Sequence, residues 1–309
     1  MAGQVAATST QRRGALLPAL AGVGVAFVAI QLWAYLAWLI NGGATQFATD
    51  AAVPGSVRSA VLLGQTLMPA VAVVWLAFVV RGAHRHRALT WPALLTAAWG
   101  LTYWQESLAN VTGARFAYNT EFVDRGDWTG FLPFIDGGGP GLPQPLVMEA
   151  FVFVGLFPAV SFAVAALLRT LRDRSGWSTA VVAACGYLIV LVIEFLIEMR
   201  SIAQGVHSYP EVFGALSIHD GAANQFPLYE NWLLALMWFL PGLVVFLARD
   251  RVTGPLELPA TIRSGAGGVA VTVLAAAGAL NSVFLLYNLI AFVWLPADTV
   301  APMPPWLNP

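Results

Sequence analysis

The residues of this sequence best suited to chemistry are glutamates inside or at the edge of long apolar stretches: Glu106, Glu149, Glu194, Glu198 and Glu230. A charge at the centre of a bilayer costs about 2.5–3.5 kcal/mol, so acids in such stretches usually face a cavity and have a function. Glu194 and Glu198 are four residues apart and share a helix face, where like charges repel and one acid is expected to stay protonated. A protonated carboxyl group beside an ionised one supplies a general acid and a general base.

Each acid also has a structural interpretation. Glu149 and Glu230 fall in the first turns of predicted helices, where the helix dipole favours negative charge. Glu106 could instead pair with Arg115 or Arg200 at the interface. No spacing of histidines and acids typical of a metal-binding helix occurs, so the sequence predicts neither a metal ion nor a cofactor.

The elements that carry these acids are predicted to be membrane helices. The 309 residues are 58% hydrophobic and 10% charged, whereas soluble domains are about 25% charged. A membrane helix needs about 20 mostly apolar residues, and seven stretches qualify: 17–40, 60–80, 89–109, 146–168, 178–199, 229–248 and 268–294. We therefore predict an all-α integral membrane protein with about seven transmembrane helices, a multi-pass protein of the cell membrane.

Arginine placement predicts the orientation of these helices. Eleven of the 15 basic residues, all of them arginine, fall on one side of the predicted membrane, which places the N-terminus in the cytoplasm and the C-terminus outside. The domain plan is a cytoplasmic tail (1–16), one membrane domain (17–294) and an extracytoplasmic tail (295–309). Two outer loops, 110–145 and 200–228, are much longer than the usual loop of about 4–6 residues. A net charge of −1 argues against nucleic acid binding, and the absence of lysine excludes a retinal Schiff base.

This topology predicts that the acids meet at one depth. With a rise of about 1.5 Å per residue, the acids of four predicted helices fall within one to two turns of the outer interface. Aromatic and polar residues lie near them in the sequence. We therefore expect a funnel that opens to the outside, with the acids at its bottom.

Several segments resemble, in order and spacing, the AveC family of spirocyclases, membrane proteins of actinobacterial polyketide pathways. Residues 104–110 (WQESLAN) are followed by Tyr118-Asn119, Glu149 follows a Gly/Pro-rich loop, and residues 225–230 (QFPLYE) lead into a predicted helix. The Glu194/Glu198 pair and residues 205–209 are similar to the next family segment, less cleanly. The resemblance covers most of residues 60–250.

The resemblance implies a cofactor-independent cyclase that closes a dihydroxy-ketone into a spiroketal with loss of water. Two departures are Glu106, where the family pattern has aspartate, and Arg200, where it is more apolar. Together with the acids discussed above, the motifs give Glu106, Glu198, Glu194 and Glu149 as candidate catalytic residues. The candidate substrate-binding residues are Trp104, Gln105, Asn110, Tyr118, Asn119, His207, Tyr209, Gln225 and Glu230.

The combined prediction is a spirocyclase-like membrane enzyme that performs dehydrative cyclisation of a lipophilic, polyketide-type substrate by acid–base chemistry. Glu106 or Glu198 would be the acid, with Glu194 or Glu149 as its ionised partner. Two other function classes stay open for the same outer acidic cavity. One is a membrane transporter, because buried acids also mark proton and ion routes; the other is a non-catalytic protein that binds a lipid or ligand.

Overall fold

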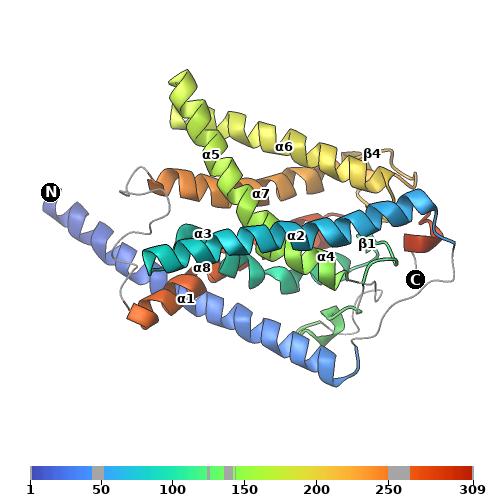
Figure 1. Ribbon diagram of the computed structural model, residues 1–309, viewed down its shortest axis with the longest axis horizontal. Coiled ribbons are helices and arrows are strands. Elements are labelled where there is room, and N and C mark those ends of the chain that lie inside the picture. Colours follow the sequence, from blue (N-terminus) through green and yellow to red (C-terminus); the bar gives the residue numbers. More distant parts are fainter. Residues whose placement is uncertain are drawn as a thin grey trace.

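The computed structural model describes residues 2–43, 52–123, 126–135, 142, 144–249 and 265–307, and these are predominantly helical. The long helices lie roughly along one direction, and α5 crosses the others obliquely (Figure 1). Six spans in this part of the chain are long and apolar enough to cross a membrane: Leu16–Ile40, Gly55–His86, Leu146–Ser175, Thr179–Ala203, Leu228–Ala248 and Gly267–Trp294. They belong to α1 (Ala2–Ile40), α2 (Gly55–His86), α4 (Leu146–Phe151) with α5 (Phe157–Ser175), α6 (Thr179–Ala203), α7 (Leu228–Arg249) and α8 (Gly265–Asn288).

The stretch expected to form a span at 89–109 is organised differently. It begins with α3 (Trp91–Gly100), which is only ten residues long, and continues as the 3₁₀ helix η1 (Tyr103–Asn110). The side-chain amide of Asn281 in α8 donates to the carbonyl oxygen of Leu101, 3.1 Å away, in the turn between the two helices. This bond occupies a carbonyl group at the end of α3, where the apolar stretch continues as a second short helix and not as one unbroken α-helix.

Close packing joins α1 to α8. A Cβ atom added to Gly24 would overlap the backbone of Leu274, and one added to Gly278 would overlap the backbone of Leu20. Small residues of this kind let membrane helices approach closely, so that dispersion contacts hold them together.

The helix that carries Glu149 contains a π-helical turn. Between α4 and α5 the chain forms η3 (Val152–Leu156), a π-helix, and a second π-helix, η6 (Leu289–Trp294), continues α8. Gly155 in η3 packs so closely on Ala72 of α2 that a Cβ atom would overlap it. Single π turns inside helices are frequent at functional sites, and this one directly follows the helix turn that carries Glu149.

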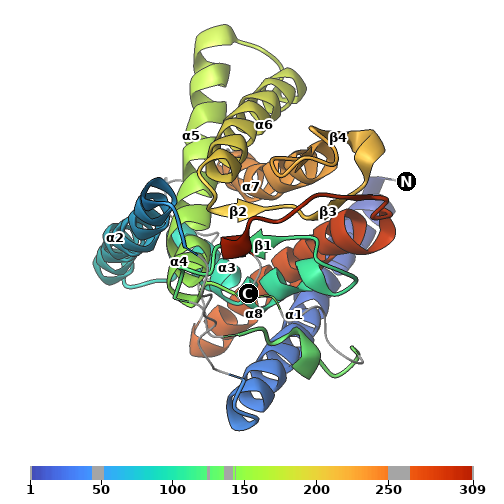
Figure 2. The ribbon, with the colours of Figure 1, turned by 90° about the vertical axis from the view of Figure 1, so that its right-hand side faces the viewer.

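The two long loops cover one end of the helix bundle. Strand β1 (Ala117–Tyr118) of the first loop pairs with β2 (His207–Ser208) of the second, with Tyr118 opposite His207. Two further pairs are β3 (Glu211–Val212) with β6 (Thr299–Val300), and β4 (Ser217–Ile218) with β5 (Phe226–Pro227). Figure 2 looks onto this end and shows β1, β2 and β3 lying across it, with the helices around them. The described residues also form the short 3₁₀ helices η2 (Thr129–Phe131), η4 (Gly214–Leu216) and η7 (Pro305–Leu307).

Aromatic side chains fill the bundle below the strands. The ring centroids of Trp99 and Phe157 are 4.8 Å apart, and those of Phe153 and Phe157 are 4.9 Å apart. Trp99 and Phe153 are fully buried. This cluster supports the cavity described next, whose lining includes Phe157. Most of the Gly/Pro-rich loop that precedes Glu149 lies outside the described residues.

Candidate active site

A cavity of about 340 Å³ lies between the helices and the paired loops. Its volume is near the lower end of the range of about 300–1,000 Å³ typical of ligand sites. Four of the five predicted acids line it, namely Glu106, Glu149, Glu198 and Glu230. Of the other predicted site residues, Tyr118, His207 and Tyr209 also line it. The structure thus brings together acids that are up to 124 positions apart, from Glu106 to Glu230.

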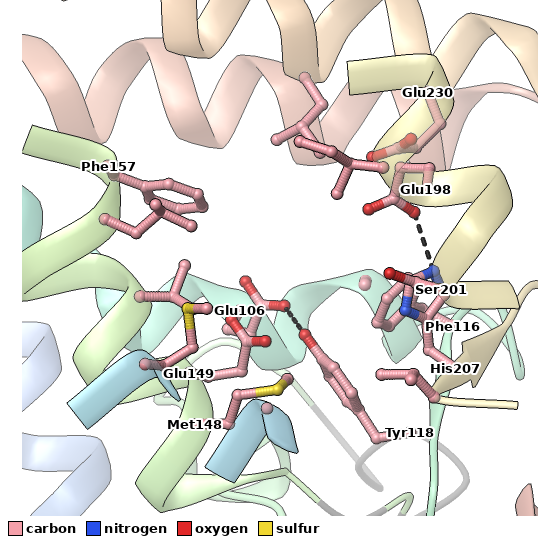
Figure 3. A pocket seen from close by; sticks show the side chains of 18 of the residues that line it. Glu106, Phe116, Tyr118, Met148, Glu149, Phe157, Glu198, Ser201, His207 and Glu230 are labelled. Atoms are coloured by element: carbon pink, nitrogen blue, oxygen red, sulfur yellow. Dashed lines mark hydrogen bonds and ion pairs between the residues drawn. The ribbon is translucent and has the colours of Figure 1, made fainter. Parts of the chain in front are cut away.

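One side of the cavity, which we call the Glu106 wall, consists of Glu106, Tyr118 and Glu149. The Tyr118 hydroxyl donates a 2.6 Å hydrogen bond to Oε1 of Glu106. The side chains of Glu106 and Glu149 lie next to each other in Figure 3. Glu149 is 8% exposed, and Glu106 accepts its bond from tyrosine, not from the arginines considered as partners. This wall therefore holds two neighbouring carboxyl groups. Its neutral donor is the hydroxyl group of Tyr118 in β1, which bonds Glu106 in η1.

Burial raises the pKa of Glu106 to about 7. The bond from Tyr118 opposes this shift, and the negative charge of Glu198 adds to it. Burial also raises the pKa of the Tyr118 hydroxyl well above its ordinary value, so this group remains a donor. Since a pKa near 7 gives comparable populations of both forms at neutral pH, Glu106 is suited to proton transfer.

The opposite side, which we call the Glu198 wall, carries Glu198, His207 and Tyr209. Nε2 of His207 lies 2.8 Å from Oε2 of Glu198, and the Tyr209 hydroxyl donates to the same oxygen at 3.0 Å. The positive φ of Gly205, 68°, turns the chain from α6 toward β2 and so toward His207. Figure 3 shows Glu198 across the cavity from Glu106. Donors converging on one carboxylate oxygen stabilise the ionised acid.

Two more acids, Glu230 and Glu194, lie close to Glu198. Glu230, in the first turn of α7, accepts a 2.7 Å hydrogen bond at Oε1 from the Tyr287 hydroxyl. Glu194 is fully buried, does not line the cavity, and has an oxygen within 4.8 Å of an oxygen of Glu198 and one of Glu230. The pair expected to share a helix face therefore meets a third acid from α7.

The amide side chains predicted to bind substrate form hydrogen bonds with the backbone of the loops. Asn110 bonds both backbone groups of Phe116, at 2.7 and 2.9 Å. Asn119 donates to the carbonyl oxygen of Gly205 at 2.7 Å. Gln225 donates to the carbonyl oxygens of Tyr209 and Pro210, at 2.7 and 2.9 Å. None of the three lines the cavity, but each fixes backbone next to Tyr118, His207 or Tyr209.

Trp104 and Gln105 also lie outside the cavity lining. Both are buried, and their side chains donate to the Oδ1 atom of Asn281, at 2.9 and 2.7 Å. They anchor η1 to α8 and thereby set the position of Glu106, the next residue.

One flank of the cavity is apolar and exposed. Leu63 and Leu67 of α2 and Ile197 of α6 line the cavity, yet they are 61%, 46% and 47% exposed on the molecular surface. The lining of the cavity therefore includes exposed apolar side chains of α2 and α6, two helices long and apolar enough to cross a membrane. The sequence led us to expect a funnel open to the outer face.

Sequence reasoning left two contributors out of the predicted site, Phe116 and Asn281. The ring of Phe116 packs on His207, with centroids 4.9 Å apart, and lines the cavity. Asn281 lies in the predicted span at 268–294, and a polar side chain in an apolar stretch was the available signal for it.

Comparisons with known proteins were made against families, curated proteins and solved structures. A family model described as spirocyclase AveC-like matches residues 85–304. No curated protein and no solved structure matches the chain. The matched region contains all five acids discussed above.

Proposed function

Because the chain belongs to the spirocyclase AveC-like family, we propose that it is a membrane enzyme that closes a dihydroxy-ketone into a spiroketal with loss of water. The observation that carries this proposal is the pair of unlike acids facing each other across one cavity. Glu106 has its pKa raised to about 7, whereas Glu198 accepts a hydrogen bond from Tyr209 and lies 2.8 Å from Nε2 of His207. Proton donation and cation stabilisation are both available there.

In the first step, Glu106 donates its proton to the hydroxyl group of a cyclic hemiketal. The C–O bond breaks, water leaves, and an oxocarbenium ion forms. Negative charge on the opposite Glu198 wall stabilises this cation, because attraction is strong in a site of low dielectric constant.

In the second step, the remaining hydroxyl group attacks the oxocarbenium carbon and forms the second C–O bond. Its proton passes to the carboxylate of Glu106, which gave up its own proton in the first step, so the starting state is restored. Glu149 lies next to this carboxylate in Figure 3. The net change is loss of one water molecule, so no oxidant or reductant is consumed.

The apolar flank supports a lipophilic, polyketide-type substrate. Leu63, Leu67 and Ile197 line the cavity and are exposed on membrane-spanning helices. A substrate dissolved in the bilayer can reach the acids from that side, and about 340 Å³ accommodates its reacting segment. The apolar helices and the family support a membrane location, and we propose the cell membrane.

The proposal is tested with Glu106→Gln and Glu198→Gln, which keep the side-chain shape but remove the proton chemistry. Product formed from a dihydroxy-ketone of polyketide type is measured by mass spectrometry in membranes containing equal amounts of inserted protein. Each variant should lose about 10²–10⁴-fold in rate, the usual contribution of acid–base catalysis.

The matched control is Glu121→Gln, an acid of the same loop region that pairs with Arg58 and does not line the cavity. It should retain turnover. Full turnover in both cavity variants would rule out the catalytic assignment. Proton-coupled solute flux in proteoliposomes would then favour a transporter, and ligand binding without flux would favour a non-catalytic binding protein.

A further inference from the structure

We propose that Glu194, Glu198 and Glu230 bind a hard divalent cation of the Mg²⁺ or Mn²⁺ class at the edge of the cavity. Each residue offers a carboxylate oxygen, and these atoms all lie within 4.8 Å of one another. Oxygen ligands bind hard divalent cations at about 2.0–2.6 Å, so two oxygens on one ion are at most about 4.0–5.2 Å apart, depending on the ion. The spacing therefore fits a shared ion.

Glu194 supplies the observation that points to a ligand. It is fully buried, and neither of its oxygens has a hydrogen-bond partner in the described structure. Unlike Glu106, Glu198 and Glu230, it has no tyrosine or histidine donor. Leaving a buried carboxyl group unpaired is strongly unfavourable, and a cation between the three acids would satisfy it.

The hydrogen bonds of the other two acids leave oxygens free for a cation. Both donors to Glu198 act on Oε2. The donor to Glu230 acts on Oε1, while its Oε2 is buried without a partner. Ligating carboxylates in metal sites are commonly hydrogen-bonded in this way by groups that do not touch the ion. His207, Tyr209 and Tyr287 would be those groups.

The donor set selects the class of ion. Carboxylate oxygens suit Mg²⁺, Mn²⁺ and Ca²⁺, and three protein oxygens leave coordination positions for other ligands. Glu198 and Glu230 line the cavity, so such positions can be reached by a hydroxyl or ketone oxygen. A divalent cation with three carboxylates leaves one negative charge, which is compatible with the cationic intermediate proposed above. The binding itself does not depend on that reaction.

A shared ion between these three acids was not predicted, because they come from two helices and lack the spacing with histidine that marks a metal-binding helix. The i, i+4 pair of α6 was visible, but its approach to the first turn of α7 depends on the packing of the two helices.

The test is Mn²⁺ binding by the full chain, purified in nanodiscs of phosphatidylcholine and stripped with EDTA. Free Mn²⁺ is followed by its electron paramagnetic resonance signal during titration. The wild type should bind one ion per chain, with Mg²⁺ competing. Tyr287→Phe keeps all three carboxylates but removes the donor to Glu230, and should weaken binding about 10-fold; Glu194→Gln should weaken it at least about 100-fold.

Glu121→Gln is the control for binding at exposed acids and should titrate like the wild type. A wild type that binds no Mn²⁺, or a Glu194→Gln protein with unchanged affinity, would overturn the proposal. If Glu194→Gln does not fold, an unchanged affinity of Tyr287→Phe overturns it equally. A protonated-carboxyl infrared band that persists with Mn²⁺ and disappears in Glu194→Gln would assign a proton to this acid and also overturn the site. Turnover enters none of these measurements, so failure here is separate from failure of the cyclase proposal.

Discussion

On the Glu106 wall of the cavity, a carboxyl group meets one tyrosine hydroxyl and a neighbouring glutamate; on the Glu198 wall, the same type of side chain meets a tyrosine and a histidine. The first setting favours a neutral acid, because burial raises the pKa of Glu106 to about 7. The second favours a negative charge, because both partners can donate to one oxygen. Two glutamates of one cavity can thus take the roles of proton donor and cation stabiliser.

The most severe test of the different roles of the two walls is a double variant that lacks both acids. Glu106→Gln and Glu198→Gln should each lose about 10²–10⁴-fold in turnover. If the two walls act on one reaction, the double variant should be little worse than the more damaged single variant, because residues acting as a unit are non-additive. Single-turnover rates of the four proteins form the measurement. Losses that multiply would mean that the walls contribute to separate steps.

The pH dependence of the wild type tests the Glu106 wall alone. A general acid must be protonated, so the rate of the chemical step should fall as pH rises through about 7, the pKa of Glu106. Above that value the fall should approach about tenfold per pH unit. Rates are measured in nanodiscs after confirming that the protein stays folded across the range. A rate that rises through the same pH would make Glu106 the base.

Tyr118→Phe tests the Glu106 wall by removing the hydrogen-bond donor of Glu106. The Tyr118 bond lowers the pKa of Glu106, so its removal should raise that pKa and move the falling limb of the pH profile to higher pH. Turnover below pH 7 should fall by less than in Glu106→Gln, since the acid is retained. The matched control is Tyr187→Phe, whose hydroxyl donates to the carbonyl oxygen of Trp232 outside the cavity; its limb should not move. An unmoved limb in Tyr118→Phe would contradict the role of this bond.

The convergence of acids was predictable from the sequence because helix direction and the rise per residue fix the depth of each side chain. Glu106, Glu149, Glu198 and Glu230 do line one cavity. The roles of Asn110, Asn119 and Gln225 were not predictable, because an amide can bond a substrate or the backbone equally well. Only the folded loops show that each amide donates to a backbone carbonyl oxygen.

The division of the 89–109 stretch was also beyond the sequence. Hydropathy measures how apolar a segment is and not whether its helix continues, and here Asn281 of a distant helix bonds the turn after α3. The expected count of seven spans and the inward N-terminus stay predictions. The long apolar helices themselves, six in the described part of the chain, follow directly from composition.

Asn281→Ala tests a residue that holds η1 in place without lining the cavity. The variant removes the acceptor for the indole of Trp104 and the amide of Gln105, and a buried donor left unpaired costs about 1–3 kcal/mol. We expect a lower melting temperature and less folded protein, while the pH at which the rate falls stays near that of the wild type. Thermal unfolding and a pH profile of the folded fraction check this. A shifted profile with unchanged stability would instead place Asn281 in the proton chemistry.

The smallest effect is expected from Arg58→Gln, which removes the ion pair with Glu121, 3.0 Å long and on the surface at the start of α2. Arg58 is exposed, so solvent screens the pair and its loss should leave the melting temperature unchanged within error. Turnover should also be unchanged, because neither residue lines the cavity. The result matters because Glu121 follows Tyr118 by three positions in the same loop. If Arg58→Gln slowed the reaction as much as Tyr118→Phe, then the loss in Tyr118→Phe would result from a displaced loop. The different surroundings of Glu106 and Glu198 would then no longer explain that loss.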